Sequence, residues 1–113
     1  MILGDINKNI NYETIEIDLQ GIDNKKDMLF KISKELNFPL WDENNWDAFR
    51  DWLSALYEPF DNYNAVKIIL KNTSNLNKDD KKILYEILNE SAEIGFDSDD
   101  GSKRIPCYYE IWD

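Results

Sequence analysis

The chain has 113 residues, of which 42% are hydrophobic and 13% aromatic, so it is long enough for one domain with a real core and too short for two. Its formal net charge is −10 at pH 7, which disfavours direct binding to nucleic acid or an anionic membrane and favours a basic partner, unless the acidity serves only solubility. Histidine is absent and Cys107 is the only cysteine, which excludes histidine-based catalysis, an intrachain disulfide and a cysteine-cluster zinc site.

The first residues indicate no export signal. The chain begins Met1-Ile2-Leu3-Gly4-Asp5, without the basic start that is typical of a signal peptide. No apolar run approaches the length that spans a membrane. We therefore expect a cytoplasmic protein. We also expect it to be monomeric when free and to carry neither a cofactor nor a metal.

The first half of the chain begins with a polar, asparagine-rich segment, residues 1–13, which we expect to be a loosely ordered arm before a single domain over residues 14–113. Residues 14–19 alternate apolar and polar side chains, which predicts a strand with one buried face. A helix is predicted over residues 25–37, before Pro39, because apolar side chains recur there at helical spacing. These side chains are Met28, Leu29, Ile32 and Leu36.

A second helix is predicted over residues 45–56, with Asn44 as its N-cap and Asp47 as a capping-box partner. Residues 57–64 read as a loop. The nearly all-apolar segment 65–70 predicts the central strand of a sheet.

Asn77 is placed to cap a third helix that ends near Gly95. Its apolar face carries Ile83, Leu84, Ile87 and Leu88. An acidic turn then leads to a last strand over residues 105–112, in which we expect Cys107 to be a small buried side chain.

The order strand, helix, helix, strand, helix, strand implies parallel strands joined by helical crossovers. The predicted fold class is α/β, a small three-stranded parallel sheet packed with about three helices that cover mainly one face. The chain has no internal repeats.

The second helix separates apolar from acidic residues. At 100° per residue, one broad face of this helix collects the side chains that we expect in the core. They are Trp46, Phe49, Trp52, Leu53 and Leu56. Asp47 and Asp51 lie on the opposite face, beside Ser54 and Ala55, where a like-charge pair four residues apart costs roughly 0.2–0.5 kcal/mol.

Six acids and one base lie between Asp42 and Asp61. A cationic partner would turn this repulsion into attraction. The alternative is that Asp47 only caps the helix and complements its dipole, while Asp51 is an ordinary solvated side chain.

The stretch Asn45-Trp46-Asp47-Ala48-Phe49-Arg50-Asp51-Trp52-Leu53 closely resembles the signature of the barstar family. Members typically show Gly-x-Asn-Trp-Asp-Ala-Leu/Phe-x-Asp-Cys-Leu after a helix followed by Phe-Pro, which is Phe38-Pro39 here. The likeness in element order runs from Thr14 to the C-terminus, and the stretch over residues 38–53 is its specific part.

The resemblance implies a barstar-like ribonuclease inhibitor, or immunity protein, and not an enzyme. Such inhibitors insert this helix and its preceding loop into the substrate groove of a basic, secreted ribonuclease of the barnase type. Acidic side chains there replace RNA phosphates. By position in the motif, Asp51 is the phosphate mimic deepest in the enzyme and Asp47 is its neighbour. The other implied partner-binding residues are Trp41, an aromatic that packs on the enzyme, Asn45 at the helix start, Asp42, Glu43, Ser54 and, by a looser match, Glu90.

Two residues depart from the family pattern. Glu43 stands in place of the glycine that normally lets the loop backbone approach the enzyme, and Trp52 stands in place of the cysteine. Both changes leave the fold assignment standing. They put in question which ribonuclease is bound.

Three other functions compete with inhibition. Acid/base catalysis by Asp47 and Asp51 would need the two carboxylates to face each other across a cleft, with the pKa of one raised by burial. Two acids on one exposed helix face meet neither condition. A calcium site in Asp97-Ser98-Asp99-Asp100-Gly101 fails the EF-hand spacing. The remaining alternative is a barstar-fold immunity or adaptor protein whose basic target is not a ribonuclease.

Overall fold

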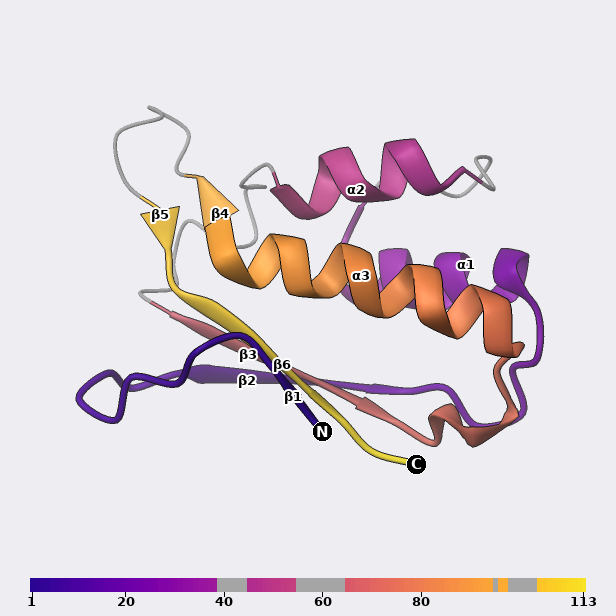
Figure 1. Ribbon diagram of the computed structural model, residues 1–113, viewed down its shortest axis with the longest axis horizontal. Coiled ribbons are helices and arrows are strands. Elements are labelled where there is room, and N and C mark those ends of the chain that lie inside the picture. Colours follow the sequence, from indigo (N-terminus) through magenta and orange to yellow (C-terminus); the bar gives the residue numbers. More distant parts are fainter. Residues whose placement is uncertain (39–44, 55–64, 95, 98–103) are drawn as a thin grey trace.

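In the computed structural model, a sheet of four strands in the order β1-β6-β3-β2 carries three α-helices on one of its faces (Figure 1). The structure describes residues 1–38, 45–54, 65–94, 96–97 and 104–113, and the statements below concern these residues. The elements are β1 (Ile2–Leu3), β2 (Glu13–Asp18), α1 (Lys25–Glu35), α2 (Trp46–Ser54), β3 (Val66–Lys71), the 3-10 turn η2 (Thr73–Asn75), α3 (Lys78–Ile94), β4 (Phe96–Asp97), β5 (Arg104–Ile105) and β6 (Cys107–Ile111).

The three predicted strands are confirmed as parallel neighbours. Strand β3 lies between β2 and β6, and Ile17, Leu70 and Ile111 stand side by side in register. β3 takes the central place in agreement with its run of buried apolar side chains, Val66, Ile68, Ile69 and Leu70. The α/β class is therefore confirmed.

A fourth strand comes from the segment that was expected to be a loose arm. Ile2 and Leu3 pair antiparallel with Glu110 and Tyr109 of β6. The terminal ammonium of Met1 also donates to the carbonyl of Ile111 at 3.1 Å. The expectation of a loose arm is wrong for these first residues, because two residues are too few to show a strand periodicity.

The ends of the first and third helices follow from local side-chain chemistry. Asn24 caps α1 by accepting a hydrogen bond from the backbone amide of Asp27 at 2.9 Å. Asn37 then takes a left-handed conformation with φ of 58°, so α1 ends two residues before the predicted position. Asn77 accepts from the amide of Asp79 at 2.9 Å, which confirms it as the cap of α3.

The core fills the space between the sheet and the three helices (Figure 1). Each helix contributes the apolar face that its spacing predicted. Fully buried members include Ile17 within β2 and Leu19 directly after it, Met28 and Ile32 of α1, Phe49 and Leu53 of α2, Leu84 and Ile87 of α3, and Tyr109 of β6.

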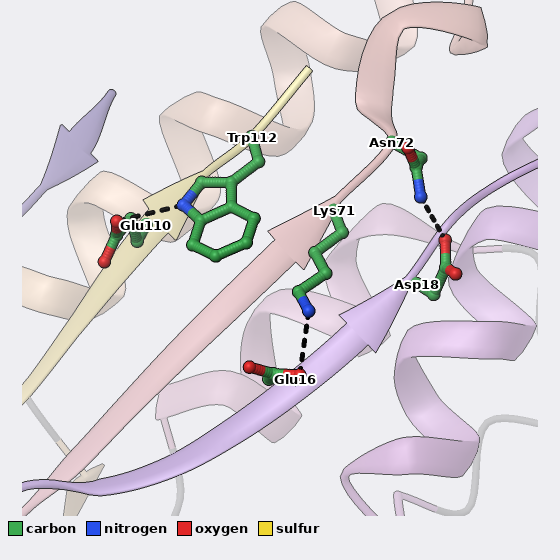
Figure 2. A network of polar contacts seen from close by, with 6 residues as sticks. All are labelled: Glu16, Asp18, Lys71, Asn72, Glu110 and Trp112. Atoms are coloured by element: carbon green, nitrogen blue, oxygen red, sulfur yellow. Dashed lines mark hydrogen bonds and ion pairs between the residues drawn. The ribbon is translucent and has the colours of Figure 1, made fainter.

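The other face of the sheet carries a network of polar side chains (Figure 2). Lys71 pairs with Glu16 at 2.9 Å and lies 5.0 Å from the ring centre of Trp112, whose indole donates to Glu110 at 2.9 Å. The bonds from Trp112 and then Lys67 hold the pKa of Glu110 below its ordinary value. This face therefore satisfies its charges internally.

Cys107 is buried at the start of β6, as expected, and burial raises the pKa of its thiol to about 12. We expect the native protein to resist a thiol reagent at pH 8 and to react once unfolded in urea, while Cys107→Ala reacts in neither state. Because only the unfolded chain ionises this thiol between its ordinary pKa and that of the native state, the free energy of unfolding should fall as pH rises above about 9. Rapid modification of the native protein would contradict this burial.

Candidate binding face on helix α2

Helix α2 begins where an asparagine side chain replaces the missing backbone partners of its first turn. The side-chain oxygen of Asn45 accepts from the amides of Asp47 at 2.8 Å and Ala48 at 3.4 Å. The prediction that Asn44 caps this helix is wrong, because Asn45 does so. Asn44 itself and the predicted end at Leu56 lie outside the described residues.

The apolar face of α2 anchors the helix on the core as predicted. Phe49 and Leu53 have no exposed surface, and Trp46 and Trp52 are half-buried against the same cluster. The ring of Trp52 stacks on Phe38 with centres 6.3 Å apart. This packing explains how the fold accommodates Trp52, where the family pattern has a much smaller cysteine.

The opposite face of α2 presents its acids to solvent. Asp47 and Asp51 are both exposed, one turn apart on the helix, as the wheel predicted. Arg50, also exposed, pairs through its Nε with a carboxylate oxygen of Glu90 on α3 at 3.4 Å. The structure thus brings Glu90 beside the acidic helix, although its contact with a partner stays a prediction.

A buried polar contact fastens α2 to α3 and to the sheet. The hydroxyl of Ser91 lies 3.3 Å from the backbone oxygen of Leu53 and 2.9 Å from the hydroxyl of Tyr109. Sequence reasoning missed Ser91 and Tyr109. The available signal was Ser91 itself, a polar residue at i+4 from Ile87 on the apolar face of α3.

Several residues assigned by the resemblance lie beyond what the structure describes. Trp41, Asp42 and Glu43 are outside the described residues, and so is most of the acidic turn before β5. Ser54 ends α2, and only its backbone is described. Their roles in binding stay predictions.

A search of the described residues found no group of three or more side chains of the kinds that hold a metal ion. None of the described helices is both long and apolar enough to cross a membrane. The acidic side chains of α2 are those of Asp47 and Asp51, whose exposed carboxylates can accept charge-assisted hydrogen bonds from cations.

The fold and site together define a small α/β domain with helices on one sheet face, one of which, α2, directs an acidic face away from the core. The sequence model of the family described as barstar (barnase inhibitor) matches residues 12–107. The chain belongs to the barstar family, whose members are inhibitors rather than enzymes. The comparisons with curated proteins and with solved structures gave no match.

Proposed function

We propose that this chain inhibits a basic ribonuclease of the barnase type by placing α2 and the loop before it in the substrate groove of the enzyme. The observation that carries the proposal is the pair Asp47 and Asp51, exposed on a helix whose other face is anchored by Phe49 and Leu53. Family membership supports the same function.

The pair has the chemistry that a phosphate-binding groove recognises. Residues four apart on a helix hold their Cβ atoms about 5–6 Å apart, so both carboxylates can meet neighbouring cations at once. Arginine and lysine bind carboxylates and phosphates through the same charge-assisted hydrogen bonds. Anchoring α2 on the core holds both acids in place before binding, which lowers the entropy lost on association.

The proposal also places the chain in the cytoplasm as a non-catalytic protein. Asp47 and Asp51 lie on an exposed helix face, whereas acid/base catalysis by two carboxylates needs them across a cleft with one pKa raised. The chain has no histidine to act as a general base in their place.

Titration of the purified chain into an RNA-cleavage assay tests the proposal, with barnase first and a panel of related basic ribonucleases after it. We expect stoichiometric inhibition of at least one enzyme. Because the chain carries a net charge of −10, the association rate constant should fall at least about tenfold between roughly 50 and 500 mM salt. Stopped-flow mixing measures that rate.

No inhibition of any enzyme in the panel at micromolar concentration would contradict the proposal, as would an association rate that is indifferent to salt. Tight binding to a basic protein without nuclease activity would favour the alternative, a barstar-fold adaptor.

A further inference from the structure

We propose that Ser91 and Tyr109 are positioning residues, whose buried hydroxyls form a chain to the Leu53 carbonyl and set the place of α2 on the domain. Ser91 is 3% exposed and Tyr109 is fully buried, so neither can touch a partner. These two hydrogen bonds join three elements that are distant in sequence, namely α2, α3 and β6. Their effect on binding rests on the proposed function.

The proton positions in this chain follow from the chemistry of its members. A backbone carbonyl only accepts, so the single hydroxyl proton of Ser91 is donated to Leu53. Tyr109 must then donate its own proton to the oxygen of Ser91, 2.9 Å away. Tyr109 keeps that proton because burial raises the pKa of its phenol well above the ordinary value.

The hydrogen bonds of Ser91 and Tyr109 fix the position of α2 in a way that apolar packing does not. A buried hydroxyl without a partner costs roughly 1–3 kcal/mol. If α2 slid or turned on the core, the Leu53 carbonyl would move away from Ser91. The Ser91 hydroxyl would then lose its acceptor, and the donor and acceptor roles of Ser91 and Tyr109 would no longer be fixed. The buried side chains of Phe49 and Leu53 pack α2 on the core, whereas the directional hydrogen bonds of Ser91 select one placement of the helix.

The placement of Leu53 decides the placement of the acids. Asp51 precedes Leu53 by two residues in the same helix, about 3 Å along its axis, so the two move together. On α3 the residue before Ser91 is Glu90, which pairs with Arg50 at 3.4 Å. Neighbouring residues of α3 therefore hold α2 twice, by an exposed ion pair and by a buried hydrogen bond.

The first test measures amide hydrogen exchange in the free protein. Ser91→Ala should speed the exchange of α2 amides about tenfold more than that of β3 amides, and Tyr109→Phe should have a smaller effect in the same direction. In the Ser91→Ala background, adding Tyr109→Phe should change the exchange of α2 amides little, since the hydrogen bonds through Ser91 are already lost.

Thr73→Val is the matched control, because the buried Thr73 hydroxyl also donates to a backbone carbonyl, that of Trp112 at 3.0 Å, which lies outside α2. It should lower protection without singling out α2. If Ser91→Ala speeds α2 and β3 exchange equally, the hydroxyls serve general stability and the positioning proposal is wrong.

The second test measures binding to a ribonuclease that the wild-type chain inhibits, at a temperature where all variants are folded. Ser91→Ala should weaken the complex about tenfold, and Thr73→Val should not. Selective loosening of α2 with unchanged affinity would overturn the role in binding. If the wild-type chain inhibits no ribonuclease, the proposed function fails, and the exchange result alone decides the positioning of α2.

Discussion

Asp51→Ala should abolish most of the inhibition while leaving the fold intact. If Asp51 occupies a phosphate position, truncation leaves the cations of the enzyme unpaired in a desolvated site, which costs on the order of 2–5 kcal/mol or more of binding free energy. That range is the general cost of truncating one partner of a charge pair buried at an interface, and close charge pairs between barnase and barstar couple by roughly 1.5–7 kcal/mol. The side chain is exposed in the free protein, so the free energy of unfolding should change by only about 0.5 kcal/mol.

Inhibition constants and urea melts of the same preparation measure the two effects together. Asp79→Ala is a matched control, since Asp79 is also an exposed acid, in the first turn of α3, and its loss should leave inhibition nearly unchanged. If Asp51→Ala unfolded the protein while the remaining folded fraction inhibited normally, Asp51 would be structural and the assignment of the site wrong.

Phe49→Ala should be the most damaging single substitution on α2 for stability. Phe49 has no exposed surface and its ring meets that of Trp46 with centres 6.2 Å apart. Removing a buried phenylalanine leaves a cavity and typically costs roughly 3–5 kcal/mol of unfolding free energy. The midpoint of urea unfolding should fall accordingly.

Phe30→Ala removes the same group from the exposed side of α1, where Phe30 is 45% exposed. It should cost far less than Phe49→Ala. Equal losses for the two variants would contradict the burial of the apolar face of α2 and, with it, the outward direction of Asp47 and Asp51.

Much of the fold could be predicted because periodicity reports which side of an element is buried. The spacing of Met28 and Ile32 predicted α1, and the apolar run around Ile68 predicted the central strand. Strand β1 could not be predicted, since Ile2 and Leu3 become a strand only through pairing with β6. The cap of α2 was predicted one residue too early, at Asn44, because two asparagines with the same capping side chain stand next to each other; Asn45 caps the helix.

The site divides in the same way. The outward face with Asp47 and Asp51 followed from the helix wheel, but its meaning came from resemblance to the barstar family, because charge alone fits a solvated helix equally well. The Arg50–Glu90 pair and the Ser91–Tyr109 contact join residues that are 40 and 18 positions apart. No local pattern encodes such contacts, which arise only when α2, α3 and β6 pack together.

The most direct test of the central claim is the mode of inhibition against RNA. If α2 occupies the phosphate sites of the enzyme, inhibition of the sensitive ribonuclease should be competitive, so that the apparent inhibition constant rises linearly with the concentration of a short RNA substrate. Inhibition that is unchanged by substrate concentration would show that the chain binds elsewhere on the enzyme, and would contradict the assignment of Asp47 and Asp51 as phosphate mimics.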